Sequence, residues 1–229
     1  MSLNKNFLAL DEFIHQALYK TKNGFYMKKN PFGNKGDFIT SPDISILFSE
    51  ILSVWTVAFW QNLQCPKEIN LIELGSGNGQ MMHDMINAFK NFPEFNKSCK
   101  FYILETSPYL IKIQKEKLKR FNVTWIKNLN EIKKNYNIFI ANEFFDALPI
   151  KQFFKINKKW MERFVISSKN NEKKFINFNS NIKKTEKKIG FRISKNQKII
   201  EYSPLSLEYL KIISKKINNK KGGLLIIDY

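Results

Sequence analysis

The chain has 229 residues, of which 43% are hydrophobic and 14% aromatic, and its formal net charge is +18. This length and apolar content suit one folded domain with a sizeable core, and they exclude a chain that is disordered throughout. Such a charge often marks a protein that binds nucleic acid or a membrane surface, but only Arg120, Arg163 and Arg192 are arginines. Proteins that bind nucleic acid prefer arginine, because its guanidinium forms paired hydrogen bonds with phosphate and guanine. We therefore expect that the lysines lie on solvated faces and that no nucleic acid is bound. An anionic partner is the alternative.

The residue types that bind metals are scattered along the chain. Cys65 and Cys99 are far apart, and His15 and His83 are also isolated. None stands at the spacing of a metal site, so no metal is expected. The first twenty residues predict an amphipathic helix rather than a signal peptide, and no apolar run approaches the ~20 residues of a membrane span. We therefore expect a cytoplasmic protein without membrane insertion.

Residues 1–66 predict an N-terminal segment of helices and loops. A helix is expected over 5–20 and a turn-rich stretch over 22–40. A long apolar helix then runs from Ser41 to about Asn62, with Pro42 and Asp43 suiting its first turn.

Residues 67–150 alternate between strands and helices, which predicts a parallel sheet with helices on both faces. We expect loop between residues 91 and 99. The expected strands are 69–74, 100–105, 122–126 and 137–141, and the expected helices are 80–90, 108–119 and a short turn near 129–133.

After this half the pattern changes. Residues 151–198 predict a β-hairpin with a polar turn at 157–159, followed over 168–197 by a hairpin extension or a partly mobile insertion. Residues 199–229 return to a strand, a helix and a buried parallel strand with the letters GGLLIIDY. Since a parallel strand normally leads into a crossover connection, we expect the C-terminal part of the fold to be truncated.

The letters ELGSGNG at residues 73–79 form the strongest motif. Glycine permits positive φ and a close approach of ligand to backbone, and the helix that follows adds free N–H groups. The dinucleotide fingerprint requires glycine where Gln80 stands, so a nucleotide-cofactor oxidoreductase is only the alternative. The spacing is instead typical of the nucleoside loop of S-adenosylmethionine (SAM) methyltransferases. The predicted loop residues in contact with SAM are Glu73, Gly75, Ser76, Gly77, Asn78 and Gly79.

A second carboxylate, Glu105, ends the next strand and could accept hydrogen bonds from both ribose hydroxyls. Glu201 stands in a similar Ser-Pro context, but only Glu105 follows the strand after the glycine loop. We also include Asn128 and Leu129 in the predicted cofactor site.

The fourth strand leads into the letters NEFFDALP at residues 142–149, where the methyl group should lie in this fold. Asn142, Glu143 and Asp146 are polar groups among apolar residues there. Enzymes that methylate the amino groups of bases carry an Asp/Asn-Pro-Pro-aromatic motif at this place. This chain lacks that motif, so base methylation is not expected.

Four stretches together resemble the MidA family of SAM-dependent methyltransferases, which includes the mitochondrial complex I assembly factor. These are GDFITSPDIS (36–45), ELGSGNG (73–79), NEFFDALP (142–149) and GGLLIIDY (222–229). The stretches YKTKNGFYMKKNPFGNKGDF and WMERFV are also similar to that family. The resemblance covers about residues 10–167 and 199–229, and it implies a Rossmann-like class I SAM methyltransferase sheet with an N-terminal helical segment and an inserted β-hairpin.

The same resemblance implies methylation of an arginine on a protein substrate, a subunit of respiratory complex I, in support of its assembly. It implies SAM as the cofactor, bound by the glycine loop and Glu105, with Gly36, Asp37, Thr40, Ser41 and Pro42 flanking it. It places Asn142, Glu143 and Asp146 toward the substrate.

An arginine acceptor is cationic and needs a desolvated carboxylate to hold it. We predict that Glu143 holds the guanidinium, with Asp146 as a second acid and Glu162 of the hairpin as a weaker candidate. The alternative of another class is a non-catalytic assembly or binding protein that keeps the SAM fold. No oligomeric state is predicted.

Overall fold

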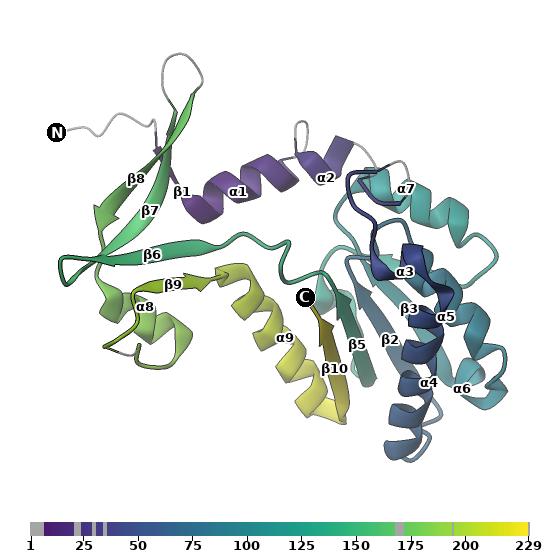
Figure 1. Cartoon of the computed structure of the whole chain (residues 1–229). Coiled ribbons are helices and arrows are strands. Elements are labelled where there is room, and N and C mark those ends of the chain that lie inside the picture. The colour runs from purple at the N-terminus through teal and green to yellow at the C-terminus, as the bar shows by residue number, and fades with distance from the viewer. Residues whose placement is uncertain are drawn as a thin grey trace. The chain divides into compact units, whose positions relative to one another are not determined.

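The computed structural model describes residues 7–20, 24–28, 31–33, 36–167, 172–193 and 195–228 (Figure 1). Parts of three predicted features lie outside them: the helix at 5–20, the turn-rich stretch at 22–40 and the stretch at 168–197. Contacts divide the chain into unit 1, Met1–Lys20 with Leu148–Glu208, and unit 2, Thr21–Ala147 with Tyr209–Tyr229. This division groups residues by contact, so it differs from the four segments predicted from sequence order.

Unit 2 is built around a five-stranded parallel sheet with the strand order β10-β5-β2-β3-β4. Along β5, Ile138 and Ile140 enter one core cluster, whereas Phe139 and Ala141 enter a second one. Alternate residues point to opposite faces of a strand, so both faces of this sheet are covered. The predicted Rossmann-like α/β sheet is confirmed. Its strands are β2 (Ile69–Leu74), β3 (Cys99–Leu104), β4 (Val123–Ile126), β5 (Tyr136–Asn142) and β10 (Gly222–Ile227).

Helices lie on both sides of this sheet (Figure 1). The helices α4 (Ile46–Asn62), α5 (Gln80–Phe89) and α6 (Pro93–Ser98) pack on one face, and α9 (Pro204–Lys220) packs on the other through Ile213. The helix α7 (Pro108–Lys117) connects β3 to β4, and the short 3-10 helix η1 (Leu129–Glu131) connects β4 to β5. The helix α2 (Phe25–Lys28) also belongs to unit 2.

Two predictions for unit 2 helices are wrong. The single helix expected from Ser41 to Asn62 is divided into α3 (Ser41–Ile44) and α4, because Ser45 is extended and its side chain accepts a hydrogen bond from the Leu47 N–H at 3.3 Å. A serine in this position caps the helix that follows. The loop expected at 91–99 contains α6, which begins at Pro93, a residue suited to the first turn of a helix.

The last strand, β10, is parallel, as predicted, and its partner is β5. The expectation that it is buried is wrong, since all its residues are partly or largely exposed and Ile226 is 44% exposed. The reason is its place at the edge of the sheet in the described part of the chain.

Unit 1 contains an antiparallel sheet in which β7 pairs with β1, β6 and β8, and β6 pairs with β9. The predicted hairpin is confirmed as β6 and β7, joined by Asn157 and Lys158, which both have positive φ as tight two-residue turns require. The strands are β1 (Phe7–Ala9), β6 (Lys151–Ile156), β7 (Lys159–Ser167), β8 (Lys173–Asn179) and β9 (Ile199–Tyr202), and the helices are α1 (Leu10–Tyr19) and α8 (Ile182–Ile189).

Two sequence predictions for unit 1 need correction. The first helix begins only at Leu10, because Phe7–Ala9 pair with β7 as a strand. The stretch at 168–197 includes the predicted hairpin extension, β8, but also the helix α8, which the weak strand signals did not indicate.

Candidate cofactor site

The parallel sheet of unit 2 reverses its strand order between β2 and β5. The chain passes from β2 to β3 and β4 on one side, and then to β5 and β10 on the other. In sheets of this kind, ligands bind beyond the carboxyl ends of the strands at the reversal point. A cavity lies there, lined by Phe32, Thr40, Pro42, Asp43, Glu73, Gly75, Ser76, Gly77, Asn78, Gln80, Met81, Asn142 and Glu143.

The glycine loop has a backbone conformation that other residue types adopt only with strain. Gly75, Gly77 and Gly79 have φ of 68°, 53° and 81°, in the left-handed region that favours glycine. A Cβ on Gly75 would lie 2.8 Å from Cδ2 of Phe144, and one on Gly77 would lie 3.3 Å from Cδ2 of Phe32. The absence of a side chain lets Gly75 pack closely against Phe144, and it keeps Gly77 clear of Phe32, which lines the cavity.

Glu73 is the buried acid of the cavity, with 4% of its surface exposed. The Ser76 hydroxyl donates a hydrogen bond to its Oε2 at 2.7 Å. Burial raises the pKa of Glu73 to about 7, the bond from Ser76 opposes this shift, and the negative charge of Glu105 adds to it. An ionised Glu73 is therefore costly unless a cation stands beside it.

Asn78 of the glycine loop forms hydrogen bonds that connect the loop to the residues before α4. Its Nδ2 donates to Oδ1 of Asp43 at 2.8 Å, and its Oδ1 accepts from Nζ of Lys117 at 3.3 Å. Oδ2 of Asp43 accepts in turn from the Thr40 hydroxyl at 3.1 Å. These bonds bring Thr40 and Pro42, which the resemblance placed beside the cofactor, to the cavity wall.

Glu105 lies just after β3 and is 8% exposed, but it does not line this cavity. Its Oε1 accepts from the backbone N–H groups of Thr106 and Ser107 at 2.8 and 2.9 Å, and its Oε2 from Nε2 of Gln114 at 3.2 Å. Nε2 of Gln114 also donates to the carbonyl of Gly77 at 2.9 Å. Glu105 is thus linked to the glycine loop through Gln114, and burial raises its pKa.

The carboxyl end of β5 brings Asn142 and Glu143 to the opposite wall. Glu143 has a positive φ of 48°, and its N–H donates to the carbonyl of Ile227 at 2.8 Å, so β10 fixes its backbone. Nδ2 of Asn142 approaches Oε1 of Glu143 at 3.5 Å. Oδ1 of Asn142 is buried and has no hydrogen-bond partner within the described part of the chain, which leaves an acceptor for a ligand.

Asp146 is exposed and is not part of the cavity lining, but it belongs to the same acidic region as Glu143. The pKa of Tyr26 is raised by burial and then by the charges of Asp146 and Glu143. The pKa of Asp228, after β10, is raised by burial and by the same two acids. Negative charge therefore accumulates beyond the ends of β5 and β10.

Several predicted residues lie away from the cavity lining, among them Gly79, Asp37 and Ser41. Gly36 closes a turn, since a Cβ there would lie 2.3 Å from the carbonyl oxygen of Pro31. Asn128 caps η1, and Leu129 is 1% exposed in the core. Glu162 is in unit 1, where it forms an ion pair with Lys151 at 2.8 Å.

Four lining residues were not predicted: Phe32, Asp43, Gln80 and Met81. Phe32 lies in a stretch that the family resemblance covers, and this was the one sequence signal for it. Asp43 also lies in such a stretch, residues 36–45, but it was assigned only to a helix start, because its contact with Asn78 joins residues 35 positions apart.

Two features of the described chain bear on other classes of protein. Within the residues placed by the structure, no group of three or more His, Cys, Asp or Glu side chains is arranged to hold a metal ion. Within the same residues, no helix is long and apolar enough to cross a membrane.

A parallel sheet with a glycine loop and a cavity at its reversal point defines a Rossmann-like nucleoside-cofactor protein. Residues 51–229 match the model of a family described as "Putative S-adenosyl-L-methionine-dependent methyltransferase". The chain belongs to this family, whose cofactor is SAM.

Curated relatives include the mitochondrial protein arginine methyltransferase NDUFAF7 of Xenopus laevis, which is 30% identical over 97% of this chain and 56% of its own length. The homologue in Caenorhabditis elegans is 31% identical over 97% of this chain and 58% of its own. The chain thus spans about half the length of the curated relatives it matches.

The fold is similar to that of a COG1565 superfamily member from Burkholderia thailandensis, crystallised with S-adenosyl-homocysteine bound. The TM-score is 0.74 at 19% identity, over 91% of this chain and 55% of the other. At this identity the likeness shows the fold, and it agrees with the family assignment.

Proposed function

We propose that the protein transfers a methyl group from SAM to an arginine side chain of a protein, a subunit of respiratory complex I, and thereby supports the assembly of that complex. The observation that carries the proposal is the cavity that joins the glycine loop after β2 to Asn142 and Glu143 after β5. The names of the relatives support an arginine acceptor. The family resemblance supports the complex I subunit, and a cytoplasmic location is part of the same proposal.

The chemistry of the cavity walls suits SAM. At the left-handed Gly77, a Cβ would lie 3.3 Å from Cδ2 of Phe32 in the cavity wall, so the glycine keeps this position clear. Glu73 offers a buried carboxylate whose ionisation a cationic ammonium would favour, and Ser76 holds that carboxylate in place. Thr40 and Asn78 complete this side, and Glu105 stays a predicted ribose ligand. When bound, SAM supplies a methyl group on a positively charged sulfur.

The opposite wall suits a cationic acceptor. Glu143 is held by the bond from its N–H to Ile227, so its carboxylate projects from a fixed backbone. A guanidinium forms strong charge-assisted hydrogen bonds with such a carboxylate, which orients the acceptor nitrogen. Asn142 adds a buried acceptor oxygen, and Asp146 adds negative charge nearby.

Cofactor binding is tested by calorimetric titration of the purified chain with SAM and, separately, with NAD. We expect SAM to bind, and we expect Gly77→Val to weaken binding at least tenfold, because its side chain would enter the cavity. Gly190→Ala is the matched control: Gly190 also has positive φ, but it lies in unit 1 and a Cβ added to it would meet nothing within 4 Å. Binding of NAD instead of SAM would favour the oxidoreductase alternative.

Catalysis is tested with radiolabelled SAM and complex I subunits, using Glu143→Gln and Asp146→Asn. Loss of a charge-assisted partner at a partly buried site costs about 2–5 kcal/mol, so Glu143→Gln should lower kcat/KM at least about 30-fold while SAM still binds. Asp146, being exposed, should have a smaller effect. If Glu143→Gln transferred methyl groups as fast as the wild-type chain, the role proposed for Glu143 would be disproved.

The substrate is tested by replacing candidate arginines of the labelled subunit with lysine. Label that persists after every arginine is replaced would disprove an arginine acceptor. SAM binding without transfer to any subunit would favour the non-catalytic alternative.

A further inference from the structure

The helix α4 is apolar on its outer side as well as on its inner side. Its inner side buries residues such as Leu52 and Trp60. On the outer side, Leu47, Ile51 and Val54 are 61%, 66% and 57% exposed, and Ala58 is exposed as well. Their spacing of four, three and four residues places these side chains in one row, the α4 stripe.

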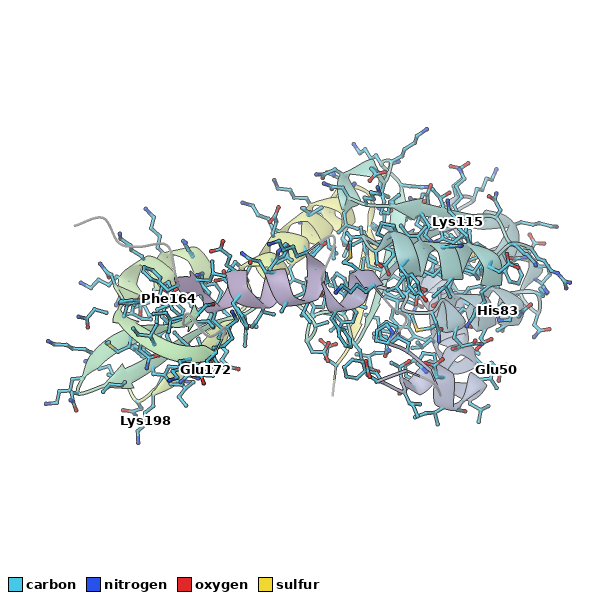
Figure 2. All side chains as sticks on the ribbon, turned by 90° about the horizontal axis from the view of Figure 1, so that it is seen from above. Glu50, His83, Lys115, Phe164, Glu172 and Lys198 are labelled. Carbon is cyan, nitrogen blue, oxygen red and sulfur yellow. The ribbon has the colours of Figure 1, made fainter. Side chains whose placement is uncertain are left out.

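The α4 stripe is the centre of a larger apolar patch. Ile44 and Ile46, which precede it, are 73% and 55% exposed. The exposed polar side chains of α4 are Glu50 (labelled in Figure 2), which lies beside the stripe, and Gln61 and Asn62 at the end of the helix. A helix that is apolar on all sides is normally buried on all sides. An exposed apolar patch of several hundred Å² usually marks an interaction site.

The charge pattern indicates what covers this patch. The chain has 38 lysines and arginines in 229 residues, but residues 36–66 contain none. Lysine side chains project from the helices and strands of both units (Figure 2). Two copies of a chain with a net charge of +18 repel each other least where both surfaces lack these charges. An anionic partner or lipid surface would favour lysines beside the patch.

The spacing of the α4 stripe also suits a helix as the partner surface. Apolar residues that alternate by three and four form the seam along which two helices pack. We propose that a second copy of the chain docks on the α4 stripe, so that the α4 helices of the two copies pack against each other. This association does not depend on the proposed methyl transfer.

The expected dimer is weak and depends on concentration and salt. The helix α4 is about 26 Å long at 1.5 Å per residue, so a helix pair buries less than the ~800 Å² per partner of a standard interface. Added salt screens the repulsion between the two positively charged copies. We therefore expect dimerisation to strengthen from about 50 mM to about 500 mM sodium chloride.

Sedimentation equilibrium over a range of concentrations tests the proposal. We expect Ile51→Glu to weaken dimerisation at least 100-fold, because each copy would bring a charge into the apolar seam. Glu50→Gln is the matched control on the same helix and should change the dimerisation constant by less than about threefold. Far-ultraviolet circular dichroism would verify that both variants are folded.

Disulfide cross-linking tests the contact itself. In a Cys65→Ser background, Ile51→Cys should form a linked dimer on oxidation, whereas Lys112→Cys, at an exposed position on α7, should not. Three results would overturn the proposal: a monomer at all concentrations, a dimer that Ile51→Glu leaves unchanged, or a monomer that binds phosphatidylcholine vesicles through this patch.

Discussion

The two sheets of the chain bury their residues to different extents. Every residue of β2 is buried, and so are the five central residues of β5, whereas β8 in unit 1 has no buried residue. The parallel sheet is covered by helices on both faces, and the antiparallel sheet leaves much of its surface to solvent. The cavity lies at the end of the more constrained sheet, where packing holds the positions of functional groups.

The largest expected difference between the sheets concerns their aromatic residues. Phe139 on β5 is fully buried, whereas Phe175 on β8 is 65% exposed. Phe139→Ala should lower the free energy of unfolding by about 3–5 kcal/mol, because it leaves a cavity in the core. Phe175→Ala should change it by less than about 1 kcal/mol. Urea denaturation measures both, and similar losses would contradict the comparison.

The buried acid Glu73 should make stability depend on pH. The pKa of Glu73 is about 7 in the folded chain, compared with the usual glutamate value of 4.5 expected in the unfolded chain. Between these two pH values the folded chain therefore binds more protons than the unfolded chain. Stability should therefore fall as pH rises from about 4.5 to 7, by at most about 3 kcal/mol. In Glu73→Gln this fall should become smaller, and the part that remains should come from groups such as Glu105, whose pKa is also raised by burial. Glu201→Gln, at an exposed position of unit 1, is the control and should keep the wild-type slope.

Two left-handed glycines separate the effect of backbone strain from that of crowding. Alanine at either position forces a side chain into φ near 70–85°, which costs about 1–2 kcal/mol. At Gly75 the new Cβ also meets Phe144, so Gly75→Ala should cost about 1 kcal/mol more than Gly190→Ala. Thermal unfolding of the two variants tests this, and equal losses would show that Phe144 moves aside freely.

The smallest effect concerns polar pairs within each sheet. Nδ2 of Asn70 donates to Oδ1 of Asn137 at 2.9 Å between β2 and β5, where both residues are buried. Asn137→Ala leaves that donor unpaired and should cost about 1–2 kcal/mol. Gln152→Ala, which removes an exposed hydrogen bond to Glu201 in unit 1, should cost less than about 0.5 kcal/mol. A double-mutant cycle with Asn70→Ala would isolate the contribution of the buried pair.

The sequence predicted the parallel sheet well because apolar strands and amphipathic helices alternate at regular intervals. The glycine loop could be located because three glycines at alternate positions after a strand indicate a backbone that needs positive φ. Asp43 and Gln80 could not be assigned to the cavity, since their positions depend on contacts with Asn78 and Lys117 on other elements. The division at Ser45 was missed because apolar residues continue on both sides of it.

The residues of unit 1 stand in the sequence between Glu143 and Ile227, which meet at the ends of β5 and β10. Glu143 follows β5 directly, but the carbonyl that fixes its backbone belongs to Ile227, after residues 144–226 have been made. During synthesis the glycine loop can fold as soon as β2, α5 and β3 emerge, whereas the wall that carries Glu143 must wait for β10. A ribosome-bound chain is therefore expected to form its glycine loop before the backbone of Glu143 is fixed.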